Sequence, residues 1–159
     1  MMLALGVDPG TATTGYGLVR LEPDGMLEAV AHGVIVTRPH TPAHERLLAL
    51  FEDISDLIAL HRPDTYAVEK LFFQRNVSTA IGVGQARGVV LLAIARAGGE
   101  PAEYTPNEVK QAVAGYGAAQ KRQVQEMVRT LLRLPELPQP DDAADALAVA
   151  ITHLHTRRF

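Results

Sequence analysis

Leu3-Ala4-Leu5-Gly6-Val7-Asp8 is a short apolar run that ends in an acid. A polar turn over residues 9–14 follows it, and a second apolar run covers residues 15–21. Pro23-Asp24-Gly25 then introduces a third run over residues 26–36. Short apolar runs separated by turn residues are typical of strands joined by tight connections. The stretch therefore predicts a three-stranded antiparallel meander at the start of the chain.

The rest of the chain predicts helices that alternate with two further strands. Thr41-Pro42 should cap and start a helix, because proline suits the first helical position. That helix carries apolar residues at helical spacing, namely Leu47, Leu50, Phe51, Ile54, Leu57 and Ile58. Strands are expected over residues 66–69 and 101–104, and helices over 78–97, 105–114, 118–132 and 141–158. This order predicts an α/β fold with a mixed sheet flanked by helices.

The expected helix over residues 78–97 is apolar nearly all round, which predicts that it is largely buried. Ala80, Gly84 and Gly88 lie four residues apart and form a smooth stripe. Because a glycine inside a helix costs up to about 1 kcal/mol relative to alanine, we expect a packing reason for the stripe. It could pack tightly on the chain's own sheet or against a second copy, and both interpretations stay open.

Composition limits the class of protein. The 159 residues are 47% hydrophobic and 21% charged, which suits a single domain over residues 1–159. Without cysteine, disulfides, thiolate zinc sites and cysteine nucleophiles are excluded. No apolar run approaches the roughly 20 residues of a membrane span, so we expect no membrane partner and a cytoplasmic protein. The net charge is −3, but residues 108–133 carry five bases against two acids.

Four separated acids are candidates for a metal site. Asp8 and Glu69 each lie at the carboxyl end of an expected strand, the edge at which ligand crevices form in α/β sheets. Asp142 and Asp145 are three residues apart at the start of a helix and share one face. Carboxylate oxygens suit Mg²⁺ or Mn²⁺, and two such ions roughly 4 Å apart can promote phosphodiester hydrolysis. The four acids therefore predict a metal-dependent nuclease.

Each acid except Glu69 also has a structural explanation. Asp8 precedes Pro9-Gly10 and suits the start of a turn. Asp142 and Asp145 suit the first turn of a helix, where capping and the helix dipole favour acids. Neither a cap nor a turn requires Glu69. Spacing alone leaves the structural and the metal-binding interpretations open.

Several segments in order along almost the whole chain resemble RuvC-type Holliday junction resolvases of the ribonuclease H-like superfamily. They are Gly6-Val7-Asp8-Pro9-Gly10-Thr11, Thr14-Gly15-Tyr16-Gly17, Ala67-Val68-Glu69, Gly84-Gln85-Ala86-Arg87-Gly88, Val109-Lys110-Gln111, Met127-Val128-Arg129-Thr130-Leu131-Leu132 and Asp142-Ala143-Ala144-Asp145-Ala146-Leu147-Ala148. The resemblance implies a five-stranded mixed sheet with helices on both faces. It also implies an endonuclease that resolves four-way DNA junctions by paired symmetric nicks in recombination and repair.

The resemblance implies a role for particular residues around the metal. The metal-binding catalytic acids would be Asp8, Glu69, Asp142 and Asp145, which would hold two Mg²⁺ or Mn²⁺ ions. Asp8 would be shared by both ions. The family pattern selects Asp142 and leaves Asp141 as a helix cap. Lys121 would be a catalytic residue that steadies the charge of the phosphate.

The resemblance also implies residues that contact DNA. They are Phe72, Phe73, Arg75, Asn76, Lys110, Lys121 and Arg122, with Phe72 stacked on bases at the crossover. We expect Phe73 to be partly buried, and both phenylalanines could instead belong to the core. The lysines could be solvated surface charges. His153 and His155 point to different faces of the last helix and are expected to be surface or partly buried residues.

The implied partners are four-way junction DNA, a second copy of the chain in a homodimer, and the RuvA–RuvB branch-migration complex. Three other functions compete with this interpretation. An actin-like ATPase uses a similar turn after its first strand, but it needs two such domains. Another ribonuclease H-like nuclease could act on RNA or on other branched DNA. A binding module could recognise junctions without cutting them, although four intact acids argue against a dead site.

Overall fold

The computed structural model describes residues 1–70 and 77–157. Its centre is a five-stranded sheet with the order β3-β2-β1-β4-β5. The strands are β1 (Met2–Asp8), β2 (Thr13–Leu21), β3 (Leu27–Val36), β4 (Thr65–Glu69) and β5 (Pro101–Tyr104). The first three strands form an antiparallel meander, whereas β4 is parallel to both β1 and β5. The predicted meander and mixed sheet are confirmed.

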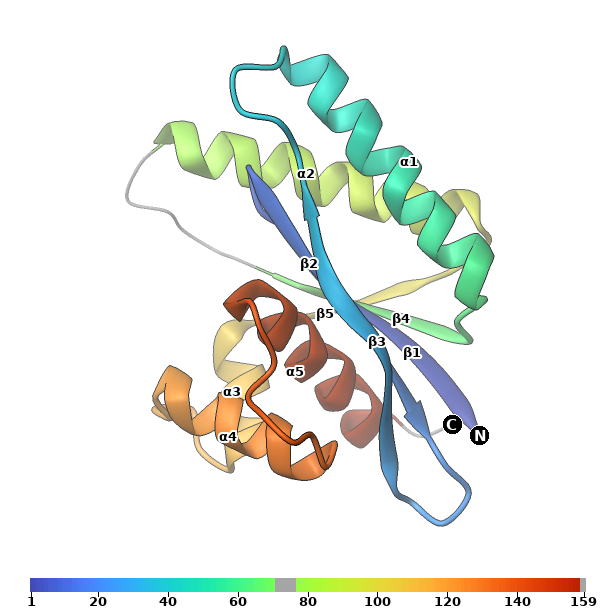
Figure 1. The fold of residues 1–159 in the computed structure, drawn as a ribbon, viewed down its shortest axis with the longest axis vertical. Coiled ribbons are helices and arrows are strands. Elements are labelled where there is room, and N and C mark those ends of the chain that lie inside the picture. The colour runs from blue at the N-terminus through green and yellow to red at the C-terminus, as the bar shows by residue number, and fades with distance from the viewer. Residues whose placement is uncertain (71–76, 158–159) are drawn as a thin grey trace.

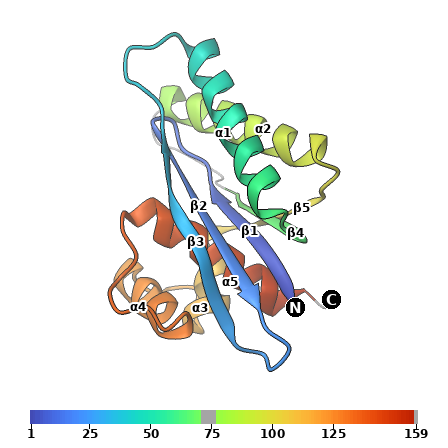
Figure 2. The same ribbon diagram turned by 45° about the vertical axis from the view of Figure 1, so that its right-hand side comes forward.

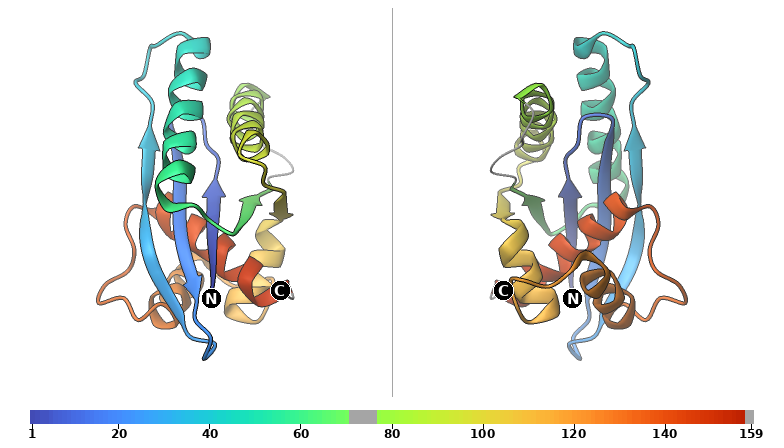
Figure 3. Two further views of the ribbon diagram at one scale, coloured as in Figure 1. Left: turned by 90° about the vertical axis from the view of Figure 1, so that its right-hand side faces the viewer. Right: turned by 90° about the vertical axis from the view of Figure 1, so that its left-hand side faces the viewer.

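Helices cover both faces of the sheet (Figures 1 and 3). One face carries α1 (Ala43–His61) and α2 (Val77–Arg96), and the other carries α3 (Pro106–Ala114), α4 (Lys121–Leu131) and α5 (Asp141–Thr156). Each face has its own apolar core. Ile54 and Ile94 lie in the first core, and Leu147 and Val128 lie in the second. The alternating side chains of β1 supply both cores, because successive residues of a strand point to opposite faces.

The capping residues in the sequence predicted the start of one helix correctly and the starts of two others only approximately. The capping box at Thr105 is confirmed, since its hydroxyl accepts from the Glu108 backbone N–H and the Glu108 carboxylate accepts from that of Thr105. Pro42 is the N-cap of α1 rather than its first helical residue, and no side chain in the described part of the chain caps that end. Helix α4 begins at Lys121, three residues later than expected, because Gln120 forms the cap with Gln123.

Helix α2 is buried on one side only, so the prediction of a largely buried helix is wrong. Ala86 and Ile94 face the sheet, whereas Ile81 is 57% exposed and Leu92 is 59% exposed. A Cβ added to Gly84 or Gly88 would have no described atom within 4 Å. The glycine stripe therefore does not pack on the chain's own sheet, because that face of α2 points away from it.

The exposed side of α2 also qualifies the expectation that no segment approaches a membrane span. The window Thr79–Arg96 reaches a mean hydropathy of 1.2, and 22% of it is buried. By length and composition it meets the minimum for a span. This is weak evidence for a membrane, because core helices of water-soluble proteins meet the same test.

His153 is fully buried, which corrects the expectation of a surface or partly buried residue. Its imidazole lies 2.6 Å from the Thr65 hydroxyl and 2.8 Å from the Tyr104 hydroxyl, which together satisfy its two ring nitrogens. Burial, aided by the charge of Arg157, lowers the pKa of His153 to about 4. The side chain therefore joins α5 to β4 and β5 as a neutral group. His155 is exposed, as predicted.

Candidate metal centre and active site

Three glycines on β1 and β2 let α5 approach the sheet closely. A Cβ on Gly15 would overlap the backbone carbonyl of Asp142, and one on Gly6 would overlap the backbone of Ala146. A Cβ on Gly17 would come within 2.8 Å of the Leu147 side chain. Helix α5 therefore lies directly across the two strands (Figure 2), with its first turn beside the end of β1. Sequence reasoning missed this role, although Gly15 and Gly17 share one face of their strand by spacing.

The four predicted acids converge. Val7 pairs with Val68 in the parallel register, so Asp8 and Glu69, which follow them, lie side by side. Their carboxyl groups share a hydrogen bond. Oxygens of Asp8, Asp142 and Asp145 all lie within 4.8 Å of one another. All four acids line one cleft of about 430 Å³, whose rim includes residues 9–13.

Burial and mutual repulsion make this cluster unfavourable when it is fully ionised. Asp8 is 9% exposed, and its burial, followed by the charge of Glu69, raises its pKa. Burial likewise raises the pKa of Glu69 and of Asp145. A shared proton relieves the repulsion between Asp8 and Glu69, and a cation would relieve it for the whole cluster. The all-oxygen donor set fits a hard divalent ion such as Mg²⁺ or Mn²⁺.

Lys121 supplies a positive charge at the edge of the acids. Its ammonium lies 3.5 Å from an Asp145 oxygen and 3.5 Å from an Asp141 oxygen. Burial acts to lower the pKa of Lys121, but the two carboxylates outweigh it and the pKa is raised. Lys121 also lines, with Lys110, Glu69 and Asp145, a groove of about 220 Å³ between α3 and α4. The two predicted lysines therefore border two of the clustered acids, Glu69 and Asp145.

Asp141 is not the cap of α5, and that prediction is wrong. Pro140 is the N-cap residue, and no side chain in the described ranges makes a capping hydrogen bond there. The Asp141 carboxylate is drawn instead toward α4, where it meets Lys121 and accepts a 3.2 Å hydrogen bond from the Gln125 amide. Asp141 thus tethers the first turn of α5 to the first turns of α4.

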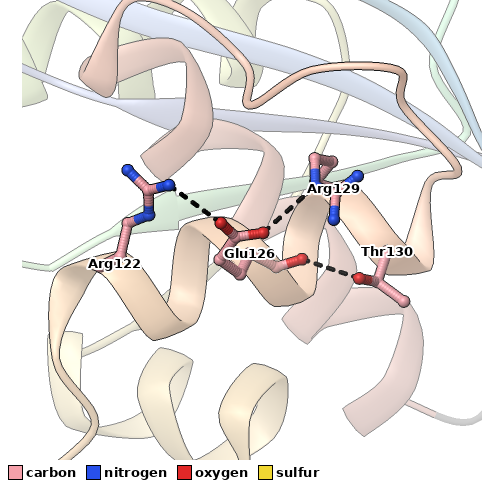
Figure 4. A network of polar contacts seen from close by, with 4 residues as sticks. All are labelled: Arg122, Glu126, Arg129 and Thr130. Carbon is pink, nitrogen blue, oxygen red and sulfur yellow. Dashed lines mark hydrogen bonds and ion pairs between the residues drawn. The ribbon is translucent and has the colours of Figure 1, made fainter.

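Arg122 lies on the exposed side of α4, apart from the acids. Its guanidinium bonds to Glu126 at 3.1 Å, and Arg129 bonds to the other oxygen of the same carboxylate at 3.2 Å (Figure 4). The hydrogen bond from Arg129 lowers the pKa of Glu126, which stays ionised between the two arginines. Arg122 is 70% exposed, and its ion pair with Glu126 joins residues four apart on this surface of the helix.

Phe72, Phe73, Arg75 and Asn76 lie outside the described residues. They belong to the connection between Glu69 on β4 and the start of α2. Their predicted contacts with DNA and the expected burial of Phe73 stay predictions.

Comparison with known proteins gives a consistent result. The family model described as crossover junction endodeoxyribonuclease RuvC matches residues 4–153. The protein of that name from Heliobacterium modesticaldum is 57% identical over 155 residues, which cover 98% of this chain and 95% of the relative. Its counterpart from Syntrophomonas wolfei is 54% identical over 158 residues, which cover 99% of this chain and 91% of the relative.

A solved structure agrees with the sequence comparison. The structure of T. thermophilus RuvC in complex with a Holliday junction substrate superposes with a TM-score of 0.93 and is 39% identical in sequence. The match covers 98% of this chain and 94% of that chain.

Proposed function

This chain belongs to the RuvC family of crossover junction endodeoxyribonucleases, and from that premise we propose how its own residues cut a Holliday junction. As a family member it is a structure-specific endonuclease of DNA recombination and repair. One observation carries the assignment of the active site: four acids from β1, β4 and α5 meet in one cleft, and Lys121 borders them. We assign the whole of residues 1–159 to a single nuclease domain.

The acids and the lysine have different roles at the scissile phosphate: the acids would bind the metal ions, and Lys121 would stabilise negative charge. Asp8 is in reach of Glu69 and also of Asp142 and Asp145, which supports a role as the residue shared between two ions. The ions, Mg²⁺ or Mn²⁺, would supply an activated hydroxide and neutralise the leaving oxygen. Lys121 holds its charge beside Asp145, where it steadies the negative charge that develops on the phosphate.

The DNA contacts extend from this cleft across α3 and α4. Lys110 and Lys121 line the groove next to the acids, and Arg122, the next residue of α4, presents an exposed charge. Lysine and arginine contacts of this kind position the phosphate backbone without reading sequence. Phe72 and its neighbours Phe73, Arg75 and Asn76, which follow Glu69 in the sequence, would contact the DNA at the crossover. The solved relative bound to a Holliday junction supports this class of substrate.

We place the homodimer contact on the exposed side of α2. Ile81 and Leu92 are more than half exposed there, and Gly84 and Gly88 leave the helix backbone open to a close approach. Burying this surface against a second copy would remove apolar area from water. A two-fold dimer would present two acid clefts to symmetric strands of the junction. The protein would act in the cytoplasm, and the RuvA–RuvB branch-migration complex is the partner that family membership suggests.

A cleavage assay tests this function. Purified protein with Mg²⁺ or Mn²⁺ should nick a synthetic four-way DNA junction at paired positions and leave linear duplex largely intact. Asp8→Asn and Glu69→Gln should abolish cleavage and still bind the junction, since the fold and the basic surface are unchanged. Full cleavage by either variant would refute the assigned mechanism. Faster cutting of an RNA–DNA hybrid than of the junction would instead assign the site to another ribonuclease H-like activity.

A further inference from the structure

Residues 9–12 connect β1 to β2 and form a wall between the acid cleft and a second cavity. Gly10, Thr11 and Ala12 line the acid cleft on one side. The same three residues line a separate cavity of about 230 Å³ on the other side. The cavity is bounded largely by apolar side chains of β3, α1 and α2, including Ile35 and Leu50. The wall begins immediately after Asp8, so its position determines where that carboxylate lies.

One arginine fastens this wall to the rest of the molecule. Arg46, in the first turn of α1, donates from Nη2 to the Thr11 carbonyl at 3.0 Å. Its Nε and Nη2 also donate to the Thr37 hydroxyl, at 3.1 and 3.0 Å. Thr37 in turn donates its backbone N–H to the Ala12 carbonyl at 3.0 Å. Arg46 therefore joins the wall to the residue that follows β3.

The polar contacts of the Arg46 side chain are with the wall and with Thr37, which is itself bonded to the wall. Within residues 1–70 and 77–157 no acid forms an ion pair with it, and the hydrogen bonds of its guanidinium all go to Thr11 and Thr37. On the opposite side, a Cβ on Gly82 of α2 would come within 2.5 Å of the Thr11 methyl group. The wall is thus held between α1 and α2, with the cavity beneath it.

We propose that Arg46 is a positioning residue for Asp8. The cavity offers space into which the wall could yield, and any such shift would move Asp8, which immediately precedes the wall. By holding the Thr11 carbonyl, Arg46 keeps the wall out of the cavity and keeps Asp8 within reach of Asp142 and Asp145. Arg46 does not line the acid cleft, so it acts through the backbone rather than on the substrate. The inference rests on the metal site proposed above.

Metal binding by the full chain without DNA tests this role directly. Residues that orient metal ligands from outside typically contribute about 10–100-fold to metal affinity or activity. We expect Arg46→Met to weaken Mn²⁺ binding, measured by electron paramagnetic resonance of free Mn²⁺, by about tenfold. Cleavage should recover as Mn²⁺ is raised, and junction affinity should not change. The Mn²⁺ affinity of Arg46→Lys should lie between those of the unaltered protein and Arg46→Met, because one ammonium can make only some of the hydrogen bonds that the guanidinium makes.

Two further variants keep the test decisive. Thr37→Val removes the hydroxyl that Arg46 uses and keeps the shape of the side chain, so it should weaken Mn²⁺ binding in the same direction. Combined with Arg46→Met it should add little, since both changes break one network. Arg20→Met is the matched control, because Arg20 pairs with Glu28 at 3.2 Å near the far end of the β2–β3 hairpin.

The outcomes separate the two proposals. Unchanged Mn²⁺ affinity in Arg46→Met and Thr37→Val, even with a lower melting temperature, would overturn the role of Arg46 and leave the metal site intact. An equal loss of Mn²⁺ affinity in Arg20→Met would also overturn the role of Arg46, because the loss would then reflect a general effect on stability. Failure of the unaltered protein to bind Mn²⁺ would refute the metal site and the role of Arg46 together. If Arg46→Met does not fold, Thr37→Val decides.

Discussion

Replacing Gly15 with alanine tests whether the close approach of α5 assembles the active site. Gly15 pairs with Asp8 across β1 and β2, and a Cβ there would overlap the carbonyl of Asp142. A backbone atom cannot rotate away as a side chain can, so the first turn of α5 must retreat by on the order of 1 Å to restore ordinary contact. Asp142 and Asp145 would then move away from Asp8.

The expected magnitudes separate catalysis from folding. Overpacking of this kind costs typically about 1–3 kcal/mol, less than the roughly 5–15 kcal/mol by which domains are stable, so the variant should fold. A misplacement of about 1 Å can lower a rate by about 10²-fold. We therefore expect Gly15→Ala to melt a few degrees lower, at about 2–4 °C per kcal/mol, and to cleave about 10²-fold more slowly.

Single-turnover cleavage of a four-way junction at saturating Mn²⁺, with thermal unfolding measured in parallel, checks both numbers. Gly117→Ala is the control, because its Cβ would come no closer than 4.0 Å to the Asn107 carbonyl. It should cleave and melt like the unaltered protein. A Gly15→Ala variant with an unaltered rate would refute the reasoning, and so would a loss of rate fully explained by the fraction unfolded.

Three further predictions follow from the site and from α2. Burial and Glu69 raise the pKa of Asp8, so the metal-free fold binds this proton more tightly than the unfolded chain does, and stability should fall as pH rises above the ordinary 3.8 toward about 10. Calorimetry should show that the stability of Asp8→Asn falls less with pH than that of the unaltered protein, and that Mg²⁺ reverses the fall only in the unaltered protein. Parallel curves of stability against pH for the two proteins would show that Asp8 is not the cause. Lys121→Met should lower the cleavage rate by about 10²-fold, as loss of a group that stabilises transition-state charge does, and should barely change the melting temperature, since exposed ion pairs contribute about 0–1 kcal/mol. An unaltered rate would exclude Lys121 from catalysis. Ile81→Glu should produce monomers in sedimentation and abolish paired nicking, whereas Leu60→Glu, at an even more exposed apolar position on α1, should not; a stable Ile81→Glu dimer would place the interface elsewhere.

Local chemistry alone predicted much of the fold. Turn residues between short apolar runs located β1, β2 and β3, and Thr105 located the start of α3. These signals act over a few residues, so they can be recognised without knowing what packs nearby. The placement of Asp8 and Glu69 at strand ends was of the same kind. Their meeting required only that β1 and β4 be parallel neighbours.

Surroundings decided what local patterns left open. The apolar pattern of α2 could not reveal that one of its faces has no covering element within the described residues. From the sequence alone, His153 is an ordinary polar residue of α5. Its burial depends on the hydroxyl groups that β4 and β5 supply to its ring. Asp141 suits a cap by position, yet Lys121 and Gln125 of α4 draw its carboxylate away.

The sequence by itself identified four candidate acids for metal chemistry and predicted at which ends of which elements they lie. Only the tertiary structure decided that they form one site. Asp8 and Asp145 are separated by most of the chain, and they meet because Gly6, Gly15 and Gly17 leave a surface smooth enough for α5 to lie against β1 and β2. That contact is a property of two strands and a helix together, and no local pattern encodes it.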